Sequence, residues 1–80
     1  SGREDPVTEA ESRRLTAEIA AFLRTLPEEK RRIFVDRYFA LVPIRELAEK
    51  NGCSEERIKS LLLRLRRALA VHLEKEGFDL

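Results

Sequence analysis

The strongest constraint on the fold is the spacing of the large apolar residues, which recur three or four positions apart through most of the chain. In the last third they fall at Ile58, Leu61, Leu62, Leu65, Leu69 and Leu73. This spacing places side chains on one face of an α-helix, and no stretch alternates between apolar and polar residues as a half-buried strand does. The sequence therefore predicts an all-α domain of four helices and no strand.

Local signals set the limits of the first two helices. Thr8 and Glu11 have the spacing of a capping box, with Ser12 as a second candidate N-cap. The apolar face of the first helix comprises Leu15, Ile19, Phe22, Leu23 and Leu26. Pro27 disfavours helix at the residue before it, so this helix should end near Thr25. The second should cover about residues 27–40, with an apolar stripe of Ile33, Phe34, Tyr38 and Leu41 and with Val35 and Phe39 beside it.

A helix-turn-helix is predicted over residues 43–76. A short helix starts at Pro43, and its inner face comprises Ile44, Leu47 and Ala48. Gly52 suits the left-handed position after that helix, and Ser54 suits the N-cap of the next. The last helix should continue to about Glu76 and end at Gly77, after which residues 78–80 fold back or fray. A short helix, a tight turn with glycine and a longer helix are typical of this motif.

Length and composition favour a single domain. The chain has 80 residues, of which 42% are hydrophobic, and this is enough for one thin core. We expect the domain to span residues 8–80. Residues 1–7 carry no periodic pattern and are expected to be a flexible tail, in which Ser1-Gly2 has the character of an expression-tag remnant.

The distribution of charge is more informative than the net charge of +1. Residues 57–67 hold five basic side chains and no acidic one. Such a stretch is the electrostatic footprint of phosphate contacts, although a solvated helix face explains it equally well.

On a helical wheel, Glu56, Lys59, Ser60, Leu63 and Arg67 lie opposite the buried side of the last helix. A glutamate can accept from a cytosine amino group, and lysine can bind guanine or a phosphate. Arg57, Arg64 and Arg67 are better placed for phosphates or flanking contacts. The full set of candidate DNA-binding residues is Ser54, Glu55, Glu56, Arg57, Lys59, Ser60, Leu63, Arg64 and Arg67.

Enzymatic, metal and membrane functions are not indicated. One cysteine and one histidine fall short of a usual zinc ligand set, so we expect no metal and no cofactor. Cys53 is expected to be a small buried residue, and His72, Tyr38 and the four phenylalanines to be structural. No apolar run is long enough to cross a bilayer and no signal peptide is visible, which predicts a cytoplasmic protein.

Several short motifs together resemble region 4 of the sigma-70 family, with the extracytoplasmic-function (ECF) group fitting best. They are Leu26-Pro27-Glu28-Glu29, Arg37-Tyr38-Phe39, Glu46-Leu47-Ala48-Glu49, Gly52, and residues 54–60 with Arg64 and Arg66. The resemblance covers residues 12–76 and identifies the chain as a C-terminal fragment of a longer bacterial factor. Primary sigma factors have a Glu-Arg-Ile-basic string like residues 56–59, which makes Glu56, Arg57 and Lys59 the leading contacts, with Ser60 next.

The resemblance implies a role in transcription initiation. The helix from Ser54 to Arg67 would recognise the −35 promoter element in duplex DNA. RNA polymerase would dock through the β-flap on an apolar surface, and an anti-sigma factor is a further candidate partner. The sequence departs from the ECF pattern at Pro43, where a capping residue is usual, and at Leu61, where arginine is usual. Leu63 should point outward, toward a thymine methyl or a protein partner.

Two alternatives remain open. The effector domain of a response regulator is also a four-helix helix-turn-helix, but its usual Thr-Val-Lys string fits Arg57-Ile58-Lys59-Ser60 less well. A helix-turn-helix that binds protein instead of DNA is favoured by Leu63 and by the near-neutral net charge.

Overall fold

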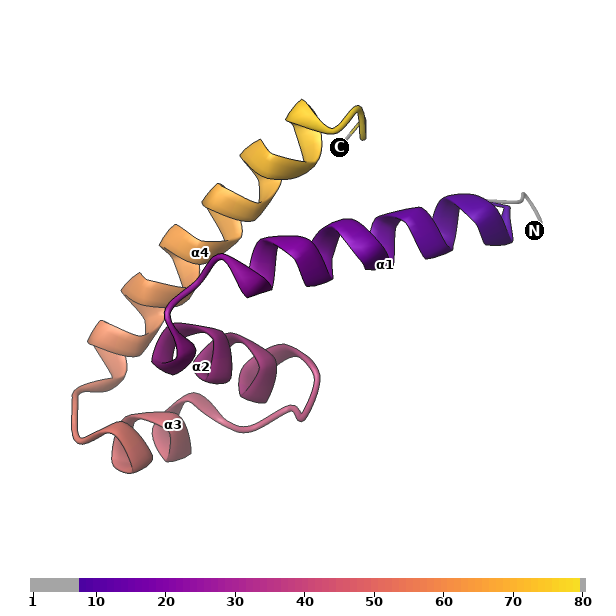
Figure 1. Ribbon diagram of the computed structural model, residues 1–80. Helices are drawn as coiled ribbons and strands as arrows, with labels where there is room; N and C mark the ends of the chain where they lie inside the picture. Colours follow the sequence, from indigo (N-terminus) through magenta and orange to yellow (C-terminus); the bar gives the residue numbers. More distant parts are fainter. Residues whose placement is uncertain (1–7, 80) are drawn as a thin grey trace.

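The structure, a computed structural model, describes residues 8–79 and contains four α-helices (Figure 1). They are α1 (Glu9–Arg24), α2 (Glu28–Tyr38), α3 (Ile44–Asn51) and α4 (Glu55–Lys75). No strand occurs between residues 8 and 79, so the predicted all-α class is confirmed. The predicted tail over residues 1–7 and the last residue, Leu80, lie outside the described range.

The capping box at the start of α1 is confirmed. The Thr8 hydroxyl accepts a hydrogen bond from the Glu11 backbone N–H at 3.1 Å, and the Glu11 carboxylate accepts from the Thr8 N–H at 3.3 Å. Two backbone donors at the helix start are thereby satisfied. At the other end the Thr25 hydroxyl donates to the Phe22 carbonyl at 2.6 Å, and α1 ends where the sequence predicts.

The end of α2 differs from the prediction. The helix stops at Tyr38, two residues early, and Leu41 adopts a left-handed backbone with φ of 59°. Leu41 is 76% exposed and Phe39 is 64% exposed, so the predictions that Leu41 joins the apolar stripe and that Phe39 packs in the core are wrong. The physical reason is the early helix end, since the Val42 N–H turns back to the Asp36 carbonyl at 2.9 Å and carries residues 39–41 off the buried face.

The helix-turn-helix has the predicted local chemistry. Gly52 is left-handed with φ of 64°, and the Cys53 N–H donates to the Ala48 carbonyl at 3.0 Å. The Ser54 hydroxyl then caps α4 by accepting from the Arg57 N–H at 3.1 Å. Pro43 makes no side-chain cap to α3, which agrees with the departure seen in the sequence.

Two groups of buried side chains form the core. The first joins α2, α3 and α4 through Ile33, Leu47, Ala48, Ile58 and Leu62, and Cys53 packs against it. The second joins α1, α2 and α4 through Phe22, Leu23, Phe34 and Leu65. Tyr38 and Leu61 are partly buried and pack against both groups. The core therefore fixes α4 against every other helix and leaves one side of α4 uncovered.

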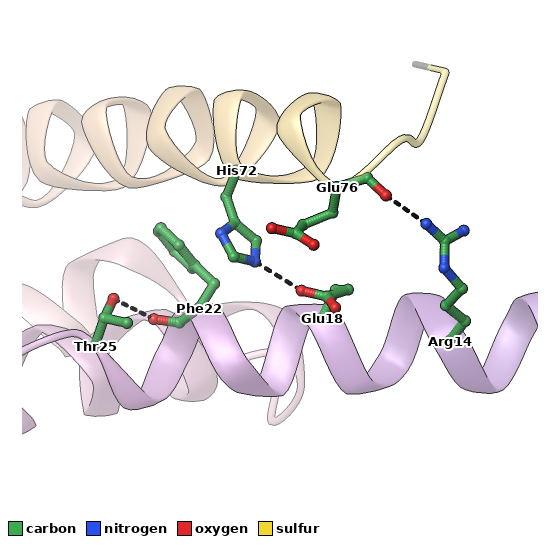
Figure 2. Close-up of polar contacts among 6 residues, drawn as sticks. All are labelled: Arg14, Glu18, Phe22, Thr25, His72 and Glu76. Carbon is green, nitrogen blue, oxygen red and sulfur yellow. Dashed lines mark hydrogen bonds and ion pairs between the residues drawn. The ribbon is translucent and has the colours of Figure 1, made fainter.

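Polar side chains join α1 to the end of α4 (Figure 2). His72 Nε2 lies 3.0 Å from Glu18 Oε1, and the His72 ring lies 5.8 Å from the Phe22 ring. Arg14 donates to the Glu76 carbonyl and lies 4.2 Å above the Phe78 ring. The Phe78 N–H returns to the Leu73 carbonyl at 2.9 Å, so Phe78 folds back onto the helices. These contacts give His72 the structural role that the sequence predicts.

Candidate nucleic-acid interface

The outward side of α4 is the candidate recognition face, defined by Glu56, Lys59, Ser60, Leu63 and Arg67. All five side chains are exposed, and Leu63 is 38% exposed. The opposite side of the same helix buries Ile58, Leu62, Leu65 and Leu73. Leu63 therefore points outward, as the helical wheel predicts.

The other candidate residues extend this face at its start and along one edge. Ser54 and Glu55 lie at the N-terminus of α4, and Arg57 and Arg64 lie along the edge that faces the first half of α2; all four are exposed. All nine sequence-predicted candidates are therefore exposed on α4 or at its N-cap, and Glu55 lies on the side toward α3, where it lines a cavity with Pro43 and Glu46.

A basic groove borders each edge of the recognition face. The first, called the Arg57 groove, has a volume of about 400 Å³ and includes the cations Lys30, Arg57 and Arg64 together with the carboxylate Glu29. The second, called the Leu63 groove, has a volume of about 430 Å³ and is lined by Arg37, Tyr38, Ile44, Lys59, Leu62, Leu63 and Arg66. Three cations therefore lie in each groove, on opposite edges of one helix.

Lys30, Arg37 and Arg66 were not among the sequence-predicted site residues. Arg66 follows Lys59 by seven positions, close to two helical turns, so both lie on the same edge of α4. Lys30 and Arg37 have the same separation on α2. This spacing could have indicated two basic edges from the sequence. It does not show that the edges form grooves, because that depends on how α2 packs against α4.

Several contacts fix the side chains of the Leu63 groove. Arg37 Nη1 donates to the Val42 carbonyl at 3.2 Å, and Arg66 Nη1 donates to the Tyr38 hydroxyl. Lys50 Nζ also lies 3.6 Å from Asp36 Oδ2 and joins α3 to α2. The two arginines are thus held in place before any ligand arrives.

A third cavity, called the apolar groove, lies between α2 and α4. It has a volume of about 290 Å³ and is lined by Phe34, Tyr38, Arg66, Leu69, Ala70 and Leu73. Apart from the Tyr38 hydroxyl and the Arg66 guanidinium, its side chains are hydrocarbon. An apolar side chain from another molecule is the kind of group that such a cavity accepts.

The remaining chemically versatile residues are engaged in packing. Cys53 is partly buried beside the first core group, and His72 is paired with Glu18. Within residues 8–79, no three His, Cys, Asp or Glu side chains gather as a metal site would require. None of the four helices described is long and apolar enough to span a bilayer.

Comparison with known families gives a single assignment. The model of the family "Sigma-70, region 4" matches residues 22–70, which include all of α2 and α3 and most of α4. No curated protein matches the sequence. The family match extends over more than half of the chain and contains the whole recognition face. The chain therefore belongs to the sigma-70 region 4 family, whose members are helix-turn-helix DNA-binding domains of the transcription machinery.

Proposed function

We propose that this domain recognises the −35 promoter element for transcription initiation, with α4 in the major groove. The observation that carries the proposal is the exposed recognition face with a basic groove on each edge. A recognition helix in the major groove lies between the two phosphate strands, and it reads bases mainly through its N-terminal residues. Such a role places the protein in the bacterial cytoplasm.

Each candidate residue has a proposed role that suits its chemistry. Glu56 accepts from a cytosine amino group, and Lys59 donates to guanine. Ser60 contacts a base or the backbone, and Leu63 contacts a thymine methyl. The remaining candidates contact the sugar-phosphate backbone of the DNA. They are Ser54 and Glu55 at the N-terminus of the helix, and Arg57, Arg64 and Arg67.

The proposal is tested by selecting duplexes from a randomised library with the purified domain. We expect the recovered sequences to share a short motif, and the affinity for that motif to fall steeply as salt rises, because phosphate neutralisation releases counterions. Recovery of unrelated sequences, or salt-independent binding, would contradict promoter recognition.

We also propose that the apolar groove receives the β-flap of RNA polymerase. Region 4 domains generally bind the polymerase as well as promoter DNA. Leu69 and Ala70 line this groove but lie outside the recognition face, so one domain can engage both partners at once. The test is a pull-down of the core polymerase with the wild-type domain and with Ala70→Glu, which would place a charge in the groove. Equal retention by both proteins would rule out this groove as the docking site.

A protein-interaction module is the second candidate function. It is favoured by Phe39 and Leu41, two large apolar side chains exposed on the loop between α2 and α3. Exposed apolar side chains that gather in one patch mark a surface where a protein partner binds. Under this alternative, the domain would capture a protein while showing no salt-dependent affinity for any duplex.

A further inference from the structure

Arg66 occupies a special position between two cavities. It lines both the Leu63 groove and the apolar groove, and among residues 8–79 Tyr38 alone shares this position. The two side chains form the wall between a basic surface and a hydrocarbon one. Arg66 is exposed, and it lies beside the recognition face, in the groove that borders it.

The Tyr38 hydroxyl fixes the orientation of the Arg66 guanidinium. Arg66 Nη1 donates to this hydroxyl across 28 positions of sequence, from α4 to α2. The Tyr38 ring is itself held, since it packs against the buried Phe34 ring with centroids 4.8 Å apart. A free arginine must lose rotamer freedom when it binds a ligand, whereas this one is already ordered.

The ligand that suits this arrangement is an anion with several oxygen acceptors. Arg66 shares its groove with Arg37 and Lys59, and no carboxylate is among the described residues that line it. A guanidinium engaged through one nitrogen keeps further N–H donors, and a hydroxyl that accepts one hydrogen bond can still donate its own proton. Arginine also matches the geometry of phosphate oxygens better than lysine does.

We propose that Arg66, oriented by Tyr38, binds a backbone phosphate of the DNA strand that passes along the Leu63 edge of α4. Arg66 is then a phosphate contact and Tyr38 its positioning residue. The inference rests on the proposed DNA-binding function and adds to it a contact on the edge opposite Arg57 and Arg64. A phosphate contact carries no base information, so it operates on duplexes of any sequence.

The experiment compares the wild type, Arg66→Ala, Tyr38→Phe and the double variant on a random-sequence duplex at several salt concentrations. For Arg66→Ala we expect about tenfold weaker binding and a salt slope smaller by about 1, since one cation is lost. For Tyr38→Phe we expect about fivefold weaker binding with an unchanged slope, since the charge stays but its orientation is lost. Adding Tyr38→Phe to Arg66→Ala should cause no further loss.

Two measurements separate positioning from a general structural defect. Ethylation of single phosphates should interfere with wild-type binding at one or two positions, and that interference should disappear in both single variants. Thermal unfolding should show all variants folded, because Arg66 is exposed and phenylalanine keeps the Tyr38 ring packing. Lys75→Ala, which removes an equal charge at the far end of α4, is the matched control and should retain the wild-type salt slope and ethylation pattern.

The outcomes distinguish this inference from the proposed function. An unchanged salt slope and ethylation pattern in Arg66→Ala would overturn the phosphate contact while leaving DNA binding intact. Additive losses in the double variant would overturn the positioning role of Tyr38. A wild-type domain that binds no duplex at low salt would overturn both proposals. If Arg66→Ala behaves as expected but library selection yields no motif, only promoter recognition fails.

Discussion

At the scale of single residues, Leu41 shows how one side chain departs from the pattern around it. It combines a left-handed backbone, φ of 59°, with 76% exposure. A non-glycine residue in this region costs about 1–2 kcal/mol, and its apolar side chain gains almost nothing from burial here. Strain of this kind is often retained where a surface is used for binding, which is consistent with the second candidate function.

Leu41→Gly is therefore expected to stabilise the domain by about 0.5–1 kcal/mol, because the relief of about 1–2 kcal/mol of strain exceeds the cost of about 0.4–1 kcal/mol for the added freedom of the unfolded chain. Urea denaturation measures the change. Leu41→Ala is the control, because alanine removes the exposed side chain but keeps the Cβ that causes the strain. Equal stability of the two variants would attribute the effect to lost hydrophobicity instead of backbone strain.

Glu56 tests base recognition by a single side chain. Because a carboxylate accepts from a cytosine amino group and repels phosphates, Glu56→Ala should relax the preference at one base pair without a general loss of affinity. Binding to duplexes that differ from the selected motif at one position each measures this preference. A uniform loss across all of them would contradict the assigned role.

Lys59 is the matching test for a donor on the recognition face. Lys59→Ala should weaken binding to the selected motif by about 1–3 kcal/mol if the ammonium contacts a base. A titration with labelled duplex measures the change, and Lys75→Ala again controls for net charge. An unaltered affinity would mean that this side of α4 does not meet DNA.

At the scale of helices and turns, the predictable features are those with local chemistry. Thr8, Gly52 and Ser54 act on backbone groups within a few residues, so their roles could be assigned from sequence and are confirmed. The end of α2 could not be assigned in this way. The left-handed position after this helix holds Leu41 and not glycine. Helical periodicity alone therefore predicts a helix that continues beyond Tyr38.

The same distinction applies to the candidate site. The outward position of Glu56, Ser60 and Leu63 follows from the period of one helix, so the sequence predicts it. The contributions of Arg37 and Lys30 to the basic grooves depend on how α2 crosses α4, which no pattern within either helix specifies. Tertiary packing alone reveals that Arg66 meets Tyr38.

The two hydroxyl caps make a matched pair for testing element stability. Ser54→Ala and Thr8→Ala should each cost about 1 kcal/mol, since each leaves a helix N-terminal N–H without its acceptor. Both losses can be measured by urea denaturation. Only Ser54→Ala should also weaken DNA binding, because α1 begins far from the recognition face. A DNA-binding defect in Thr8→Ala would mean that α1 takes part in the interface.

At the scale of the whole molecule, the start of α1 and the end of α4 point away from α2 and α3 and lie outside the family match at residues 22–70 (Figure 1). These two helix ends are together called the arm. Apolar burial is sparse there, and the arm is joined by Arg14, Glu18 and His72 (Figure 2). The Glu18 and His72 side chains are each 28% exposed, so the hydrogen bond between them is partly shielded from water. The arm therefore depends on polar contacts more than the core does.

The Glu18–His72 contact should be visible as an energetic coupling. We expect a double-mutant cycle of Glu18→Ala and His72→Ala to give about 0.5–1 kcal/mol of interaction energy in urea denaturation, the net contribution of one hydrogen bond. His72→Ala alone should cost more than Glu18→Ala, because it also removes the ring that packs on Phe22. Strictly additive losses would mean that the two side chains act independently.

The wall that Tyr38 and Arg66 share has a thermodynamic corollary. A ligand in the apolar groove and a nucleic acid in the Leu63 groove would contact opposite sides of the same two side chains. If the first ligand changes the affinity for the second by some factor, the second must change the affinity for the first by the same factor. Two titrations run in opposite order should therefore return one common cooperativity constant.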